Sequence, residues 1–141
     1  MASPLYNREI LRLAASIPHQ RRLERPQASV EKRSALCGSS IIVDVILDEE
    51  GRVSEIGQEV RACALGQASA AVMGTHAVGR TPEELGAARD ALTQYLSGSR
   101  SDAGTWPGIE ALGGARSYPS RHPAILLPFE AVSEAAARAR S

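Results

Sequence analysis

The spacing of hydrophobic residues predicts a small antiparallel sheet in the first half of the chain. The run I-I-V-D-V-I-L at residues 41–47 is rich in β-branched residues, lies between two turn-forming stretches, and is followed at hairpin spacing by residues 53–61. A third strand is predicted around residues 29–36, pairing back on residues 41–47. Such a meander leaves one sheet face for helices to cover, which indicates an α+β fold with a three-stranded antiparallel sheet.

The segments before the sheet follow a different pattern. Residues 3–17 repeat apolar positions at helical spacing, with Ser3 and Pro4 at a helix start and Pro18 after its end. The polar residues 19–34 lack a regular period, which predicts an extended connector.

Helical periodicity returns after the sheet. An alanine-rich helix is predicted to begin at Cys63 and to close near Gly79, and the sequence T-P-E-E then gives the next helix a cap and a proline in its first turn. The last helix contains Pro128 and is therefore expected either to kink there or to begin there. The remaining predicted segments are a helix over 82–96, a flexible loop over 97–104, a short helical turn over 106–112 ending at Gly113 and Gly114, and a helix over 124–139.

Length and composition favour one domain, residues 1–141, with an aliphatic core, because 43% of residues are hydrophobic and only 4% aromatic. Sixteen basic residues balance sixteen acidic ones, which argues against nucleic acid as the main partner. The locally basic residues 19–33 are interpreted as a solvated face or a docking patch. No apolar run approaches the roughly 20 residues that cross a membrane, and no signal-peptide core is visible, so we expect a cytoplasmic protein without a membrane partner.

The chain has two cysteines, Cys37 and Cys63, and a structural disulfide between them is not expected in a reducing compartment. Cys63 is predicted to lie in the first turn of a helix, where unpaired N–H groups and the helix dipole stabilise a thiolate. Cys37, on a Cys-Gly turn, could reach the same rim of the sheet, and two thiolates are half of a tetrahedral metal site. Burial as small apolar groups is the alternative, because a separation of 26 positions matches no compact zinc motif.

Several motifs occur in an order that resembles the IscU/NifU-type iron–sulfur cluster assembly scaffolds, and in particular their SufU-like branch. They are P-L-Y-N-R-E-I-L near the N-terminus, the Cys-Gly turn, D-E-E-G-R-V, R-A-C-A-L-G-Q-A-S-A-A-V-M, H-A-V-G-R-T-P-E-E-L, W-P-G-I-E-A-L and P-S-R-H-P-A-I-L-L-P-F-E-A. The resemblance covers nearly the whole chain. It implies a small antiparallel sheet covered by helices on one side, which agrees with the hydrophobic pattern.

The resemblance also implies a site. Members of the family hold a labile iron–sulfur cluster or a zinc ion on three cysteines and an aspartate, and they receive sulfur from a cysteine desulfurase. Two ligands carry over, as Cys37 and Cys63. The aspartate position is Ser39 and the third cysteine position is Ala124, so the ligand set is incomplete. His122 is a weak substitute candidate, Ser39 is a poor ligand that suits a turn, and His76 is expected to lie too far along its helix to share the site.

The function that follows from the resemblance is that of a scaffold or sulfur acceptor, not an enzyme. It would hold iron or a nascent cluster on Cys37 and Cys63 and pass it to apo-proteins, with a cysteine desulfurase as partner. Two alternatives stay open: a degenerate member that acts as a binding or regulatory protein, and a zinc-dependent sulfurtransferase. A homodimer that pools two cysteines from each chain would complete a four-thiolate site. Trp106 is expected in the core rather than as an exposed partner anchor.

Overall fold

The structure is a computed structural model that describes residues 4–35 and 38–140. Within those ranges, three strands form one antiparallel sheet in the order β1 (Ala28–Arg33), β2 (Ser40–Leu47) and β3 (Val53–Arg61). Val43 of β2 lies opposite Val30 on one side and Gln58 on the other. The predicted meander and the α+β class are confirmed.

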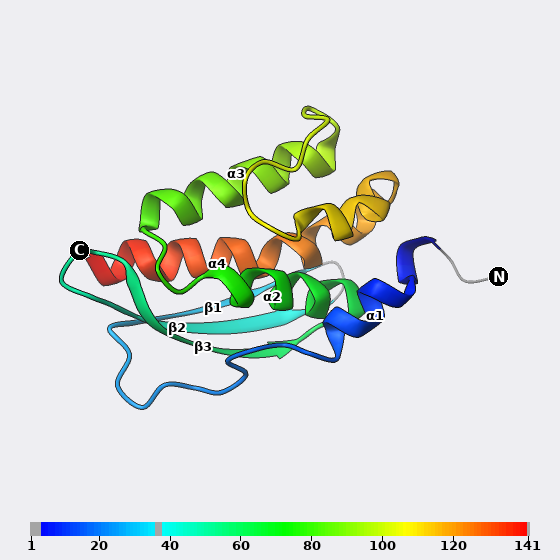
Figure 1. The fold of residues 1–141 in the computed structure, drawn as a ribbon. Helices are drawn as coiled ribbons and strands as arrows, with labels where there is room; N and C mark the ends of the chain where they lie inside the picture. The colour runs from blue at the N-terminus through cyan, green and yellow to red at the C-terminus, as the bar shows by residue number, and fades with distance from the viewer. Residues whose placement is uncertain (1–3, 36–37, 141) are drawn as a thin grey trace.

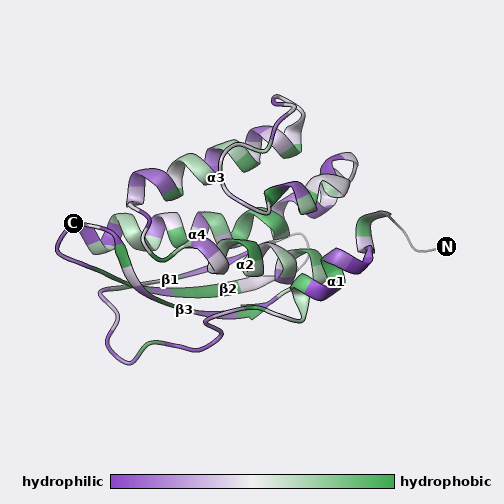
Figure 2. Ribbon diagram, viewed as in Figure 1, coloured by the Kyte–Doolittle hydropathy of each residue, from purple (hydrophilic) through white to green (hydrophobic). Residues whose placement is uncertain are grey.

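One face of this sheet carries the hydrophobic core. Alternate residues of β2, namely Ile41, Val43 and Val45, are fully buried, because the strand period of two points them to the same side. Figure 2 shows the central strand in hydrophobic green and much of the connector before β1 in hydrophilic purple. The sheet therefore has an inner, apolar face and an outer, polar face.

Helices cover the inner face in two layers (Figure 1). Helix α4 (His122–Arg140) packs across β2 and β1, and α2 (Ala64–His76) lies beside it. Helix α3 (Pro82–Ser97) packs on α4 from outside, and α1 (Arg8–Ala14) packs against α2. The 3-10 helices are η1 (Pro4–Tyr6), η2 (Ile109–Ser117) and η3 (Pro119–Arg121). In the described ranges, no helix combines the length and the apolar character needed to span a membrane.

The predicted start of the first helix is wrong. The α-helix begins at Arg8 rather than at Ser3 and Pro4, and a separate 3-10 turn precedes it; Ser3 itself lies outside the described residues. Asn7 sets the start, because its Oδ1 accepts a hydrogen bond of 2.9 Å from the backbone N–H of Ile10. A local side-chain cap of this kind competes successfully with an earlier Ser-Pro start.

The predicted turn over residues 106–112 is also misplaced. The helical segment is η2, which begins at Ile109 and continues through Gly113 and Gly114 instead of ending there. A Cβ atom on Gly113 would lie 2.6 Å from the Tyr95 hydroxyl of α3. The glycine therefore permits close packing on α3 rather than stopping the helix.

Helix α4 begins at His122 and runs through Pro128, so it does not begin at the proline. Pro128 has no N–H to donate to the carbonyl four residues earlier, at Ala124. Helix α2 covers this region of α4: the Ser69 hydroxyl donates a hydrogen bond of 2.5 Å to the carbonyl of Ile125. Helix α2 therefore packs directly on the turn of α4 that precedes the proline.

The connector between α1 and β1 is fixed to the outer face of the sheet. Asp44 of β2, whose side chain is fully buried, accepts hydrogen bonds from Arg22 (2.8 and 3.1 Å), from the backbone N–H of Leu23 (2.9 Å) and from the hydroxyl of Ser29 (2.6 Å). Burial alone would raise the pKa of Asp44, but these hydrogen bonds outweigh it and lower the pKa. Asp44 therefore acts as an ionised clamp for the connector.

Candidate functional site

Cys63 lies at the junction between the sheet and α2. It is the N-cap residue of this 13-residue helix, with extended backbone angles (φ −64°, ψ 170°), immediately before the first turn in which it was predicted. Its carbonyl accepts the first helical hydrogen bond, from Gln67 N–H at 2.9 Å, and its side chain makes no capping bond. The thiol is half-buried against the core. It therefore stands at the positive end of the helix dipole, partly accessible to solvent.

The turn that follows β1 returns to the same end of the sheet. Ser40, the first residue of β2, lies opposite Arg61, the last residue of β3, so the chain before Ser40 and the chain after Arg61 leave the sheet together. Gly38 has a φ of +71°, which only glycine adopts readily, and its N–H bonds the carbonyl of Ser34 at 3.1 Å. Cys37 lies outside the described residues, so its meeting with Cys63 stays a prediction.

Ala124, at which the family resemblance predicts a cysteine ligand, lies beside α2. Ala124, in the first turn of α4, is 2% exposed, and its carbonyl oxygen and Cβ lie 3.3 and 3.7 Å from where a Cβ of Gly66 would be. Gly66 is three residues, about one helical turn, after Cys63. A methyl group thus occupies this position next to the first turn of α2.

The two weak ligand candidates have structural roles. Ser39 is buried in the β1–β2 turn, and its carbonyl accepts a hydrogen bond of 2.8 Å from the N–H of Ser34. His122 places Nε2 at 2.8 Å from the carbonyl oxygen of Ala115, which can only accept, so Nε2 carries the proton. Across residues 4–35 and 38–140, no three His, Cys, Asp or Glu side chains gather in a way that could hold a metal ion. His76 is at the far end of α2, as predicted.

Among the buried polar side chains that were not predicted from the sequence, Asp44 and Gln58 make the most extensive contacts between segments. Asp44 holds the connector, and Gln58 of β3 donates through Nε2 to the carbonyls of Pro18 (3.0 Å) and Ala70 (3.2 Å). Gln58 thereby ties β3 both to α2 and to the start of the connector. The signal for Asp44 was a single charged residue inside the run I-I-V-D-V-I-L, because a charge within such a strand needs a buried partner.

No family model and no curated protein matches the sequence. The solved structure of a nitrogen-fixing NifU-like protein (N-terminal) from Brucella abortus is 34% identical, with a TM-score of 0.91 over 98% of this chain and 96% of that one. A candidate iron–sulfur cluster assembly scaffold protein for the SUF system from Fervidobacterium islandicum shares the fold at 20% identity, with a TM-score of 0.87 over 96% and 99% of the two chains.

Proposed function

We infer the function of this protein from its family: the chain belongs to the NifU-like (N-terminal) family, and it is an iron–sulfur cluster assembly scaffold. One observation carries the site. Cys63 is the N-cap residue of the helix that follows the sheet, at the end of the sheet where Ser40 begins β2 opposite Arg61. We propose that Cys37 and Cys63 are the two thiolates that receive sulfur and hold the nascent cluster.

The place of Cys63 suits the acceptance of sulfur. Its thiolate would attack the outer sulfur of a persulfide on a cysteine desulfurase; the new S–S bond forms on Cys63, and the desulfurase cysteine leaves as a thiolate. The exchange moves one sulfur atom without a net change in oxidation state. A thiol at a helix N-terminus, partly exposed and free of a capping bond, has both the electrostatic setting and the access that this attack requires.

One chain does not supply a complete ligand set. A zinc ion or a [2Fe–2S] cluster takes four protein ligands in a closed site, and this chain offers two thiolates. Ala124 has no donor atom, Ser39 belongs to a turn, and one nitrogen of His122 is engaged by a carbonyl. We propose that two chains each contribute Cys37 and Cys63 to one cluster.

Anaerobic reconstitution tests the scaffold function. The wild-type protein, incubated with ferrous iron, cysteine and a catalytic amount of cysteine desulfurase, should develop a stable visible chromophore. Cys37→Ser and Cys63→Ser should lose it, whereas Ser39→Ala should retain it because serine is not a ligand. Absence of a chromophore in the wild type would contradict the scaffold function and favour a binding protein of the same fold; zinc in the purified protein together with sulfur transfer would favour a sulfurtransferase.

Gel filtration tests the shared cluster separately. The loaded protein should elute at twice the mass of the apoprotein and contain one cluster for two chains. A loaded species with the mass of one chain would contradict the shared site while leaving the scaffold function intact.

A further inference from the structure

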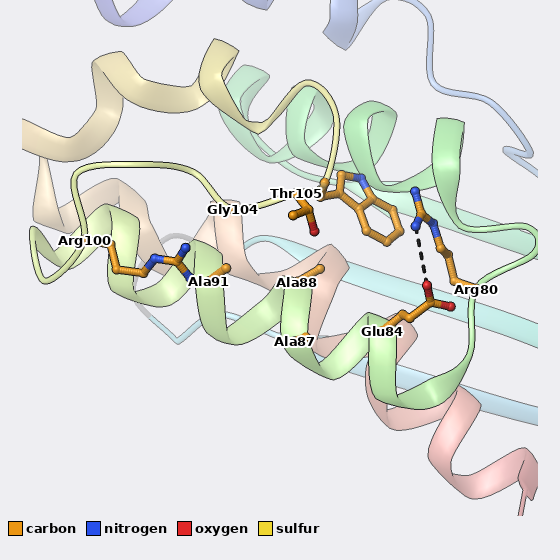
Figure 3. A pocket seen from close by; sticks show the side chains of 9 residues that line it. Arg80, Glu84, Ala87, Ala88, Ala91, Arg100, Gly104 and Thr105 are labelled. Carbon is orange, nitrogen blue, oxygen red and sulfur yellow. Dashed lines mark ion pairs between the residues drawn. The ribbon is translucent and has the colours of Figure 1, made fainter.

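A cavity of about 210 Å³ lies between α3 and the loop that follows it, away from Cys63. The side chains that line it appear in Figure 3, where Arg80 and Arg100 lie at opposite ends and Ala87, Ala88 and Ala91 form the wall between them. The cavity adjoins the second half of α2 through Trp106, which donates a hydrogen bond of 3.0 Å to the carbonyl of Val72. Val72 is nine residues, about 13 Å of helix, beyond Cys63.

The apolar part of the cavity is rigid. Trp106 is only 4% exposed, and its ring packs edge-on against Phe129 at 5.5 Å between ring centres. The three alanines of α3 end at Cβ, so they leave space that larger side chains would fill. Gly104 brings the loop so close to α3 that its Cβ would lie 3.0 Å from the Cβ of Ala91. These contacts keep an alkyl-lined hollow open beside a fixed indole ring.

Arg80 is held in position at one end. Its guanidinium lies over the Trp106 ring at 4.9 Å, and its Nε donates to the carbonyl of His76 at 3.1 Å. Its nearest carboxylate, Glu84, is 3.7 Å away, which is longer than a hydrogen bond. Glu84 also accepts from the backbone N–H of Thr81 (3.0 Å) and from Arg52 (3.4 Å). Arg80 and Glu84 thus form a loose ion pair at the cavity (Figure 3), with no hydrogen bond between them, so the terminal N–H groups of Arg80 can still donate to a ligand.

Arg100 is the cation at the other end. One of its terminal nitrogens donates to Asp102 at 2.6 Å, and its backbone carbonyl is fixed by a hydrogen bond of 2.9 Å from Arg116. With Arg52, Glu84 and Asp102 included, the charged groups around the cavity leave one positive charge in excess. The cavity as a whole therefore carries a small positive charge, with an arginine at each end and an apolar middle that suits an alkyl chain.

We propose that this cavity binds a small aliphatic dicarboxylate, with one carboxylate at Arg80, the other at Arg100 and the carbon chain against the alanines and Trp106. Arginine recognises carboxylates through paired N–H donors. The volume is below the roughly 300–1,000 Å³ of pockets for drug-sized ligands, so the ligand is small. The wall from Glu84 to Ala91 spans seven residues of α3, about 10 Å, which favours the longer dicarboxylates over succinate. This site does not depend on the proposed scaffold function.

Trp106 provides the assay, because it is the only tryptophan in the chain. The full-length protein is titrated with succinate, glutarate, adipate and suberate while tryptophan fluorescence is recorded, and calorimetry checks the affinities. Adipate and suberate should give saturable changes and bind more tightly than succinate. Hexanoate and 1,6-hexanediol, which lack one or both carboxylates, should bind at least tenfold more weakly than adipate.

Variants locate the binding. Arg100→Gln should weaken adipate binding at least tenfold, and Ala87→Leu, at the exposed mouth of the cavity, should abolish it. Arg138→Gln, on the exposed surface of α4, is the matched control and should bind normally. Circular dichroism confirms that each variant is folded. No saturable response to any dicarboxylate, equal binding of hexanoate and adipate, or unchanged binding by Ala87→Leu would overturn the proposal. Binding of a glutamate-rich peptide without any dicarboxylate would also overturn it and indicate a protein partner.

Discussion

Asp44→Asn should destabilise the protein by about 2–4 kcal/mol. Asp44 is fully buried and accepts four hydrogen bonds, two of them from Arg22. The asparagine amide keeps the shape but loses the charge, and its NH₂ group would face N–H and O–H donors. Removing one partner of a buried ion pair costs about 3–5 kcal/mol. Arg22 is 45% exposed, so water solvates its guanidinium once the partner is lost. The expected loss is therefore smaller than for a fully buried ion pair.

Urea unfolding measures this loss. The midpoint should fall while the slope m stays constant, because the variant exposes the same surface on unfolding. Asp90→Asn is the matched control: Asp90 pairs with Arg89 on the exposed surface of α3, so the change should be below about 0.5 kcal/mol. If Asp44→Asn lowered the free energy of unfolding by as little as the control does, the role of Asp44 in holding the connector on the sheet would be refuted.

The pH dependence gives a second check on Asp44. Hydrogen bonds from Arg22, Ser29 and Leu23, opposed by burial, lower its pKa from the ordinary 3.8 in the folded protein. The unfolded state therefore binds the proton more readily. The stability advantage of the wild type over Asp44→Asn should be complete above the ordinary carboxyl pKa and should shrink as the pH falls through the lower folded-state value. An advantage that grows on acidification would contradict this assignment.

Three further substitutions test the packing and the site. Gly57→Ala should destabilise the protein by about 2–4 kcal/mol in urea unfolding, because the new Cβ would lie 2.3 Å from the backbone carbonyl of Arg21; a neutral effect would contradict the position of the connector. Thr81→Ala removes a complete capping box and should cost about 1 kcal/mol in the same assay, with no change in m. Ala124→Cys should add a third thiolate beside the first turn of α2, so that the reconstituted chromophore resists a chelator at least tenfold longer than in the wild type; an equal rate of loss would show that residue 124 does not face the cluster.

The sheet and most helix positions could be predicted because local signals determine them. The β-branched run of β2, the hairpin spacing to β3 and the capping signature at Thr81 each act within a few residues. The place of Cys63 followed from the same kind of signal, a change of hydrophobic period at the end of a strand. For the proposed site, the sequence therefore predicted where Cys63 lies, and its role as a ligand stays a prediction.

The features that the sequence did not predict depend on distant contacts or on competing local ones. The connector has no period of its own, and Asp44, which is 22 residues away from Arg22, determines its course. The first helix starts at Arg8 because the side chain of Asn7 caps it. The sequence predicts a helix end at Gly113, yet in the structure this glycine lets the Tyr95 hydroxyl of α3 pack closely against the η2 backbone. Such effects are visible only once the elements are packed.

The most direct test of the scaffold function is the passage of a cluster to another protein. The protein is loaded anaerobically, freed of excess iron and sulfide, and mixed with an apo-ferredoxin whose holo-form is followed by circular dichroism in the visible range. We predict that the wild type converts the apo-ferredoxin and that Cys63→Ser, carried through the same procedure, does not. Equal conversion by the two proteins would contradict the assignment of Cys63 as a cluster ligand, and no conversion by the wild type would contradict the scaffold function itself.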